Sequence, residues 1–407
     1  MIAYEGIVLR HKEHMKQEIK SRIDNQSLQV IANSARRGES GMLDLLRRLV
    51  EQESPSNDKA SVDRCMQIAA LACQALDGSV KWHRQRHFAN LLEARFGFGS
   101  QTRTLKPVLL LGHLDTVWPL GCLQSMPCRQ AGGRIYGPGV LDMKAGVAMA
   151  LSALAILREH NFFARPVILL LNSDEEVGSP VSRSTTESIA ARCEAVFVLE
   201  PAQGLGGAYK TSRKGVGSYM VRVNGVAAHA GIDFASGHSA VVELAHQIAR
   251  ISAITDPARG ITVNPGVCAG GTQSNVVAAE AWAEVDFRFI KASDAKKIER
   301  KFLQMRPIDK KCGLVVSGGV NRPPMERTRR GIELFAKAAT LAGELGFELH
   351  EAATGGGSDG NFTSAIGIPT LDGMGAVGEG AHANHESVLI EHLVPRTALL
   401  AAMIATV

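Results

Sequence analysis

The chain has 407 residues, of which 45% are hydrophobic and 21% are charged, and its formal net charge is +5. This length is enough for a large core and two domains, and this composition excludes a disordered or fibrous protein. The basic residues are spread along the chain apart from short runs such as "RTRR" at 327–330, so we expect a solvated surface and no nucleic-acid partner.

The sequence predicts neither a membrane-spanning segment nor a signal peptide. No apolar run approaches about 18 residues, the length that a membrane-spanning helix needs, so we expect no membrane partner. The N-terminus lacks the apolar segment and the small-residue cleavage site of a signal peptide. The seven cysteines form no CxxC pair and are odd in number, which predicts reduced, mostly buried thiols in a cytoplasmic protein.

Residues 1–35 are predicted to form a charged helical extension. The following part of the chain contains three runs that are apolar on both faces, as expected of central parallel strands covered by helices. These runs are "PVLLLG" at 107–112, "PVILLL" at 166–171 and "AVFVL" at 195–199. Helices are predicted at 41–52 and 143–160. This pattern predicts an α/β domain with a mostly parallel sheet flanked by helices.

The pattern changes after about residue 210. "NVVAAEAWAEVDFRFI" at 275–290 alternates between apolar and polar residues, and so does "GSYMVRVNG" at 217–225. Residues 239–254 have the spacing of an amphipathic helix. We therefore predict an inserted α+β domain at 211–323. The α/β pattern resumes after it, so the larger domain is predicted to comprise residues 36–210 and 324–407.

Ionisable side chains follow each of the three predicted buried strands. His113 and Asp115 follow the first, Glu175 and Glu176 the second, and Glu200 the third. The carboxyl ends of parallel strands meet at one edge of a sheet, where α/β proteins bind ligands. Each residue alone could be a solvated turn acid or a core histidine. Clustered carboxylates, however, repel one another unless a cation or protons compensate, and a His/carboxylate set without thiolates suits zinc, manganese or cobalt.

Two further segments contain ligand-type residues. "IYGPGVLDMKAG" places Asp142 at the start of a predicted helix, and "GEGAHANHESV" offers His382 and His385 in a glycine-bounded loop. The two glycines before Asp142 also suggest a dinucleotide-binding loop, and hence an oxidoreductase. That alternative lacks the third glycine and the preceding strand that such a loop needs.

Six motifs in this order resemble one family. They are "HLDTV", "GPGVLDMKAG", "SDEEVGS", "LEP", "AHAG" and "GAHANHE". They look like the zinc-dependent amidohydrolases that include glutamate carboxypeptidases, aminoacylases, acetylornithine deacetylases and succinyl-diaminopimelate desuccinylases. The resemblance covers about residues 40–405. It implies a dinuclear zinc aminopeptidase-like catalytic domain, an inserted domain that mediates dimerisation, and two zinc ions per subunit.

The resemblance also implies the metal ligands. Asp142 corresponds to the carboxylate that bridges the two ions. His113 and Glu200 would complete the ligands of one ion, and Glu176 and a C-terminal histidine those of the other. The family spacing of a histidine, three residues and a glutamate favours His382, which precedes Glu386, as this last ligand. His385 is the alternative.

The same resemblance implies the catalytic groups. Glu175 matches the general base that takes a proton from the metal-bridging water, which then attacks the scissile carbonyl. Asp115 matches the acid that orients His113. His229, in "AAHAG", matches a histidine of the dimer partner that stabilises the oxyanion. An exposed turn histidine in the small domain is the alternative for His229.

Arg288 and Asn275 match family positions that bind the free carboxylate of the substrate. A surface arginine that pairs with Glu284 or Asp286 is the alternative for Arg288. The expected substrate is a small N-acyl or peptidyl amino acid, and Glu200 followed by proline favours the glutamate carboxypeptidase branch. The alternatives are an N-deacylase of the deacetylase or desuccinylase type and an inactive metal-binding scaffold.

Overall fold

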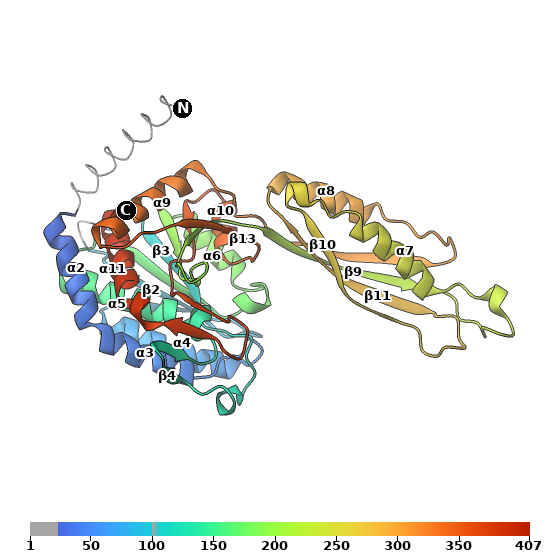
Figure 1. Cartoon of the computed structure of the whole chain (residues 1–407), viewed down its shortest axis with the longest axis horizontal. Coiled ribbons are helices and arrows are strands. Elements are labelled where there is room, and N and C mark those ends of the chain that lie inside the picture. Colours follow the sequence, from blue (N-terminus) through green and yellow to red (C-terminus); the bar gives the residue numbers. More distant parts are fainter. Residues whose placement is uncertain (1–22, 100–101, 103) are drawn as a thin grey trace, which may run out of the picture. The chain divides into compact units, whose positions relative to one another are not determined.

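The computed structural model describes residues 23–99, 102 and 104–407 (Figure 1). The chain divides into two compact units. The first contains the chain up to Ser212 together with Arg327–Thr354 and Ser358–Val407, and the second contains Arg213–Glu326 and Gly355–Gly357. Residues 1–22, which make up most of the predicted extension at 1–35, lie outside the described residues.

The first unit is built around a six-stranded mixed sheet. The strand order is β1 (Ser79–His83), β2 (Leu91–Phe96), β6 (Val167–Asn172), β3 (Val108–His113), β7 (Ala195–Val198) and β14 (Thr370–Leu371). The strands from β6 to β14 are parallel, whereas β2 is antiparallel to both β1 and β6. The three runs predicted to be central parallel strands are β6, β3 and β7, which confirms that prediction.

Helices and short strands complete this unit. The helices are α2 (Asn25–Arg37), α3 (Glu39–Glu51), α4 (Lys59–Ala75), α5 (Ala145–Glu159), α6 (Arg183–Ala190), α9 (Arg329–Glu344), α10 (Gly360–Ala365) and α11 (Ile390–Thr406), with short turns η1 (Cys122–Gln124), η2 (Val140–Lys144) and η3 (Glu175–Val177). Strands β4 (Arg129–Ala131), β5 (Arg134–Tyr136), β15 (Gly378–Glu379) and β16 (Ser387–Leu389) form a small sheet, and β8 (Tyr209–Arg213) pairs with β13 (Glu351–Thr354).

The central strands are buried on both faces. Leu110 of β3 packs in the larger core, with α5 and α11, whereas Leu109 and Leu111 pack on the other face, with residues of α6. Helix α2 belongs to the larger core through Leu28 and Ile31. Continuous apolar strands therefore arise because helices cover both faces of the sheet.

Helix α5 is apolar around most of its circumference. Together with η2 it forms a stretch, Val140–Glu159, that is long and apolar enough to cross a membrane by length and composition. However, 83% of its apolar window is buried inside the protein. A helix that is hydrophobic on all sides and surrounded by protein is a core helix.

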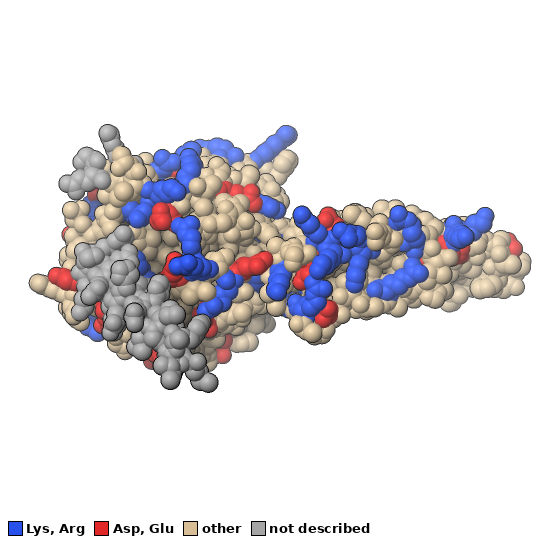
Figure 2. All heavy atoms as spheres, turned by 90° about the horizontal axis from the view of Figure 1, so that it is seen from above, with Lys and Arg blue, Asp and Glu red and all other residues tan. Residues whose placement is uncertain are grey.

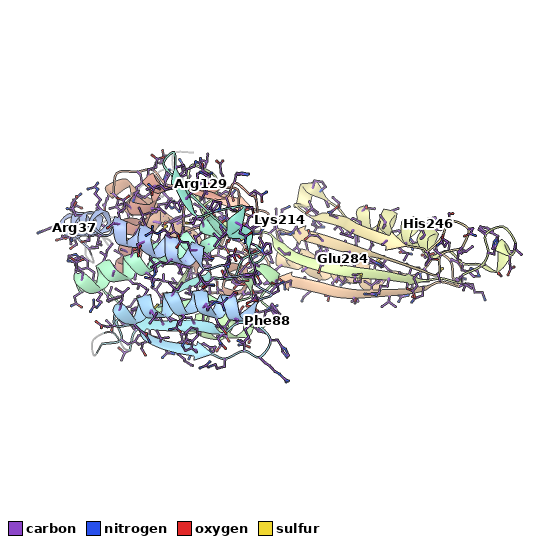
Figure 3. The ribbon with its side chains drawn as sticks, turned by 90° about the horizontal axis from the view of Figure 1, so that it is seen from below. Arg37, Phe88, Arg129, Lys214, His246 and Glu284 are labelled. Carbon is purple, nitrogen blue, oxygen red and sulfur yellow. The ribbon has the colours of Figure 1, made fainter. Side chains whose placement is uncertain are left out.

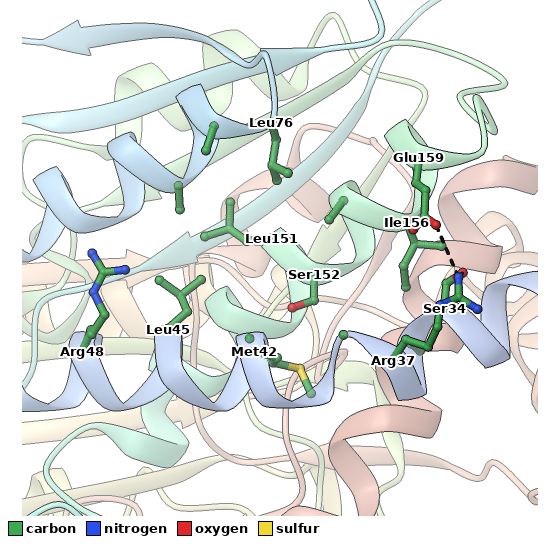
Figure 4. Close-up of a pocket in the computed structure, with 16 residues that line it drawn as sticks. Ser34, Arg37, Met42, Leu45, Arg48, Leu76, Leu151, Ser152, Ile156 and Glu159 are labelled. Atoms are coloured by element: carbon green, nitrogen blue, oxygen red, sulfur yellow. Dashed lines mark hydrogen bonds and ion pairs between the residues drawn. The ribbon is translucent and has the colours of Figure 1, made fainter.

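A cavity of about 470 Å³ lies among the helices of the first unit (Figure 4). Small residues such as Gly41, Ala72 and Ser152 line it, and Arg37 and Glu159 form an ion pair of 3.3 Å at its rim. None of the predicted site residues lines this cavity.

The second unit is an antiparallel sheet with two helices. The strand order is β10 (Thr262–Gly270), β11 (Glu280–Phe289), β9 (Gly215–Asn224) and β12 (Gly313–Arg322), and the helices are α7 (Ala240–Ser252) and α8 (Ala292–Leu303), with short turns η4 (Phe234–Ser236) and η5 (Pro257–Arg259). Both helices cover the same face of the sheet (Figure 1). The predicted alternation is confirmed in β11, where Ala283, Val285 and Phe287 are buried and Glu284 is exposed.

The surface carries charges of both signs. On the face drawn in Figure 2, Lys and Arg side chains occur on both units, with Asp and Glu side chains between them. In the second unit, His246 lies on the exposed side of α7 and Glu284 on the sheet (Figure 3). All seven cysteines are free thiols, and Cys65, Cys73, Cys193 and Cys312 are buried.

Gly146 allows the first turn of α5 to approach the sheet closely. A Cβ atom at this position would lie 2.0 Å from the backbone oxygen of Leu199, directly before Glu200. Any side chain at residue 146 would therefore push the helix away from the end of β7. This contact is one reason why the sequence needs glycine at this position.

We predict that Gly146→Ala lowers the free energy of unfolding by about 1–3 kcal/mol, because the added methyl overpacks a rigid contact. Gly343→Ala is the matched control, since residue 343 also lies in a helix but a Cβ added there would meet no atom within 4 Å. It should raise stability by about 0.4–1 kcal/mol. Urea unfolding of both variants measures the difference. Equal effects at the two positions would contradict this account of Gly146.

Candidate metal centre

The predicted ligands of the larger domain converge at one edge of the central sheet. His113 is the last residue of β3, Glu176 lies in η3 after β6, and Glu200 follows β7. Asp142 lies in η2, before α5, and His382 lies in the loop between β15 and β16. The parallel register of β3, β6 and β7 aligns the carboxyl ends of the strands, which is why residues distant in sequence meet here.

Asp142 is the shared member of the cluster. Its Oδ1 lies 3.2 Å from Nε2 of His113, and its Oδ2 lies 3.6 Å from Nε2 of His382. Glu200 Oε1 lies 3.7 Å from the same His113 nitrogen, and Glu176 Oε2 lies 3.2 Å from the His382 nitrogen. The two oxygens of one carboxylate thus face two separate His/Glu pairs.

These residues fit a cation. One ligand atom from each of His113, Asp142 and Glu176 lies within 4.8 Å of the other two, and the same holds for His113, Glu175 and Glu200. Oε1 of Glu176 is buried and has no hydrogen-bond partner among the described residues. A buried carboxylate oxygen without a partner is costly, and a metal ion at this point would satisfy it. Nitrogen and carboxylate donors without thiolates suit zinc or manganese.

Protons on the two histidines compensate the acids when no cation is bound. Burial alone would lower the pKa of His113, but its hydrogen bonds with Asp115 and Asp142 raise it well above the usual value. Hydrogen bonds with Asp142 and Glu176 raise the pKa of His382 to about 10. Burial in turn raises the pKa of Glu176. The cluster therefore requires positive charge at neutral pH.

Asp115 connects the two halves of the cluster. Nδ1 of His113 lies 3.0 Å from the Asp115 carbonyl oxygen and 3.4 Å from its carboxylate. The same carboxylate accepts hydrogen bonds of 3.2 Å from the backbone N–H groups of Glu175 and Glu176, and one of 2.7 Å from Ser56 Oγ. Asp115 therefore both orients an imidazole and fixes the segment that carries the two glutamates. The sequence contains no signal that would have identified Ser56.

Asp174, the first acid of the Asp-Glu-Glu run, points away from this cluster. Its Oδ2 accepts hydrogen bonds from the backbone N–H groups of Val181, at 2.7 Å, and Ser182, at 3.2 Å. Asp174 thus closes the loop after η3, while Glu175 and Glu176 face the cluster. The three consecutive acids have separate roles.

The C-terminal loop distinguishes its two histidines. His382 reaches Asp142 and Glu176, whereas His385 has no such ion pair among the described residues and packs beside Gly380. His382 has a φ of 63°, which is unfavourable for a residue with a side chain. Such strained backbone persists where the surrounding structure fixes it, often at functional sites.

The remaining predicted site residues lie in the second unit. His229 is exposed, and its Nδ1 accepts hydrogen bonds from the N–H groups of Gly231, at 3.1 Å, and Ile232, at 3.2 Å. In the neutral ring this arrangement leaves the proton on Nε2. The Ala230 N–H donates to the backbone oxygen of Asn275 at 2.9 Å, so His229 and Asn275 are neighbours at one end of this unit.

Arg288 lies near the opposite end of β11. Its Nε lies 2.9 Å and 3.0 Å from the two carboxylate oxygens of Asp286, and its Nη1 donates to the Gly355 carbonyl at 3.2 Å. The contact with Asp286 is the pairing that the sequence suggested as the alternative for Arg288. The Arg288 side chain is 32% exposed.

Comparison with known proteins agrees with this geometry. The profile of "Peptidase family M20/M25/M40" matches residues 109–406. The chain is 30% identical over 303 residues to carboxypeptidase G2 of Pseudomonas sp. (strain RS-16). The alignment covers 73% of this chain and 72% of carboxypeptidase G2. It is 27% identical over 314 residues to a succinyl-diaminopimelate desuccinylase of Aromatoleum aromaticum (strain DSM 19018 / LMG 30748 / EbN1). That alignment covers 72% of this chain and 80% of the desuccinylase.

A solved structure shares the fold. Aminopeptidase PepT of Bacillus cereus ATCC 10987 superposes with a TM-score of 0.73 at 20% identity, over 90% of this chain and 98% of that one. The family match confirms the resemblance drawn from the six motifs and favours a hydrolase over the oxidoreductase alternative. The chain is therefore a member of peptidase family M20/M25/M40, a hydrolytic enzyme of the metallopeptidase type.

Proposed function

We propose that the protein hydrolyses the amide bond of a small N-acyl or peptidyl amino acid with a free carboxylate, as a glutamate carboxypeptidase does. One observation carries the proposal: the two oxygens of Asp142 face two different His/Glu pairs, which is the arrangement expected of a carboxylate between two metal ions. The fully reduced cysteines agree with a cytoplasmic location.

Two zinc ions, for which cobalt or manganese can substitute, are the proposed cofactors. His113 and Glu200 would hold one ion, Glu176 and His382 the other, and Asp142 both. When bound, zinc polarises a carbonyl group and lowers the pKa of a coordinated water to about 7.

Glu175 is the proposed general base. Its carboxylate lies within 4.8 Å of ligand atoms of His113 and Glu200, and its backbone N–H is held by Asp115. It is therefore fixed beside the cluster without being needed to complete either His/Glu pair. In this position it accepts the proton of the attacking water and then passes it to the leaving amine.

The second unit supports the proposed homodimer. His229 and Asn275 lie beyond the Glu280 end of β11, and Arg288 lies eight residues along that strand, a span of about 27 Å. A dipeptide is only about 7 Å long when extended. One substrate therefore cannot contact both His229 and Arg288 of the same unit. If both residues contact the substrate, one of them comes from a second copy of the chain.

An apolar surface lies near His229. Ile232 is 83% exposed and Phe234 is 69% exposed, and Val242 of α7 is also exposed. Strand β10 is an edge of the sheet, so its outer backbone groups are available for pairing. Exposed apolar surface and a free strand edge are typical of an interface between protein copies. These features support dimerisation through the second unit.

The substrate class follows from sequence likeness together with two side chains of the second unit. Glu200–Pro201 and the similarity to carboxypeptidase G2 favour a C-terminal glutamate as the released product. Similarity to several desuccinylases favours N-deacylation as the second candidate. In both cases Arg288 of one copy and Asn275 of the second copy are the proposed carboxylate-binding residues.

We predict that the zinc-loaded protein releases glutamate from dipeptides and N-acyl compounds that end in glutamate, and that Glu175→Gln lowers kcat by about 10²–10⁴-fold while metal is retained. A chromatographic assay of a panel of dipeptides, N-acetyl and N-succinyl amino acids measures this. Release of acetate or succinate without peptidase activity would move the protein to the deacylase branch. Absence of activity in both the unmodified protein and the Glu175→Gln variant would instead support the inactive scaffold.

We predict that zinc binding to the metal-free protein releases protons at pH 7. The pKa values of His113 and His382 are raised, so both rings are protonated in the metal-free protein and must lose a proton to become ligands. The apparent affinity should therefore rise as the pH increases towards about 10, the pKa of His382. Calorimetry in buffers of different ionisation enthalpy counts the protons.

The His382→Ala variant is the control, since it should release one proton fewer than the unmodified protein. Zinc binding without proton release, or with an affinity that does not change with pH, would show that the two rings are not ligands.

We predict that two inactive variants restore activity when they are combined in one dimer. Glu175→Gln and His229→Ala would be co-expressed with different tags. If His229 acts on the partner's site, each mixed dimer has one intact site, and random assembly gives about one quarter of the full activity. If His229 acts within its own subunit, the mixture remains as inactive as the separate variants.

A further inference from the structure

Glu386 is a fully buried carboxylate that belongs to neither ligand cluster. It lies in the same loop as His382, four residues later in the sequence. The sequence singled it out only through the His-x₃-Glu spacing, without a role. A buried carboxylate needs strong hydrogen bonds to offset the loss of water.

Four donors satisfy this carboxylate, two at each oxygen. Oε1 accepts from the backbone N–H groups of Leu141, at 2.8 Å, and Asp142, at 3.1 Å. Oε2 accepts from the N–H of Gly139, at 3.0 Å, and from the indole Nε1 of Trp118, at 2.9 Å. Trp118 is in turn close in sequence to His113 and Asp115. One side chain therefore joins three segments that carry predicted site residues.

The segment that Glu386 binds cannot satisfy its own backbone. Asp142 has φ −114° and ψ 94°, which are not helical values, so the turn η2 is interrupted at the proposed bridging residue. The amide groups that Glu386 binds lie at the start of a helical segment, where the first N–H groups have no partner within the helix. In this structure the N–H groups of Gly139, Leu141 and Asp142 point at Glu386 instead. The carboxylate therefore stabilises the irregular conformation that aims the Asp142 side chain at both histidines.

We propose that Glu386 is a positioning residue that sets the affinity of the centre for metal by fixing Asp142 relative to His382. The inference rests on the proposed metal site. It assigns no contact with the metal or the substrate to Glu386. The reasoning is geometric: the loop that provides His382 also provides the acceptor that holds the backbone of Asp142.

Glu386→Gln tests this role because glutamine has the same shape. In either orientation of the amide, one oxygen is replaced by an NH₂ group that faces two donors. Two of the four hydrogen bonds are lost and two donors are left opposed. We expect zinc affinity to fall by about 10–100-fold, the range found when groups that support metal ligands are replaced. Competition with a chromophoric chelator measures this affinity without any turnover.

Glu379→Gln is the matched control. Glu379 is also a glutamate of the C-terminal region, but it is half exposed and forms an ion pair of 3.0 Å with Arg134. Its replacement should leave zinc affinity unchanged. Circular dichroism and thermal unfolding of the metal-free variants show whether Glu386→Gln is folded.

Trp118→Phe separates positioning from charge, because it removes one donor to Glu386 and leaves the net charge unchanged. It should weaken zinc binding by several-fold, less than Glu386→Gln. In the variant that combines Glu386→Gln with Trp118→Phe, one of the donors that oppose the new NH₂ group is absent. The combined fold-loss of zinc affinity should therefore be smaller than the product of the two single losses.

Each outcome is decisive. Weaker zinc binding in both Glu386→Gln and Trp118→Phe, with non-additive losses, supports positioning. A loss of zinc affinity in Glu386→Gln alone, with Trp118→Phe unaffected, would assign the effect to charge and overturn the positioning role. Unchanged zinc affinity in a folded Glu386→Gln protein would also overturn that role. If the unmodified chain itself binds no zinc, the proposed function fails, which is a separate result.

Discussion

Electrostatic repulsion among buried acids is the constraint on which the first unit depends. The side chains of Asp142, Glu176 and Glu200 are mostly buried and lie around the same two histidines, and such a group of acids is unstable unless positive charge is placed between its members. His113 and His382 provide that charge in part when they are protonated. The arrangement is therefore suited to cations, and the other features of the unit maintain the repelling groups at close distance.

The fold maintains this arrangement in two layers. Three parallel strands with continuous apolar sequences form a rigid support, and their carboxyl ends carry His113, Glu176 and Glu200. Behind these side chains, Asp115 and Glu386 accept hydrogen bonds from backbone groups of the segments that carry the ligands. The first layer brings the chain segments together, and the second holds the backbone of the segments that carry Glu175, Glu176 and Asp142.

The sequence pointed to the proposed ligand residues more clearly than to the residues that support them. His113, Glu176 and Glu200 each lie in a short motif directly after an apolar run, so local pattern and strand topology place them. Trp118, Ser56 and Glu386 act through contacts with residues far away in the chain, and a periodic pattern contains no information about such contacts. The antiparallel β1 and β2 were also missed, because charged residues interrupt the apolar pattern of both. Apolar spacing did predict α7 and the alternating face of β11, where burial follows from the local pattern.

The order of the proposed ligands along the chain has a consequence for biosynthesis. His113 is the first to be made and His382 the last, and Asp142 stands between two sets that are completed at different times. A chain that ends before the loop at residue 382 contains His113 and Glu200 but lacks both the last ligand and the acceptor that holds Asp142. It would expose three acids without the full complement of counter-charge. The proposed site can therefore be completed only after residues 382–386 have been made.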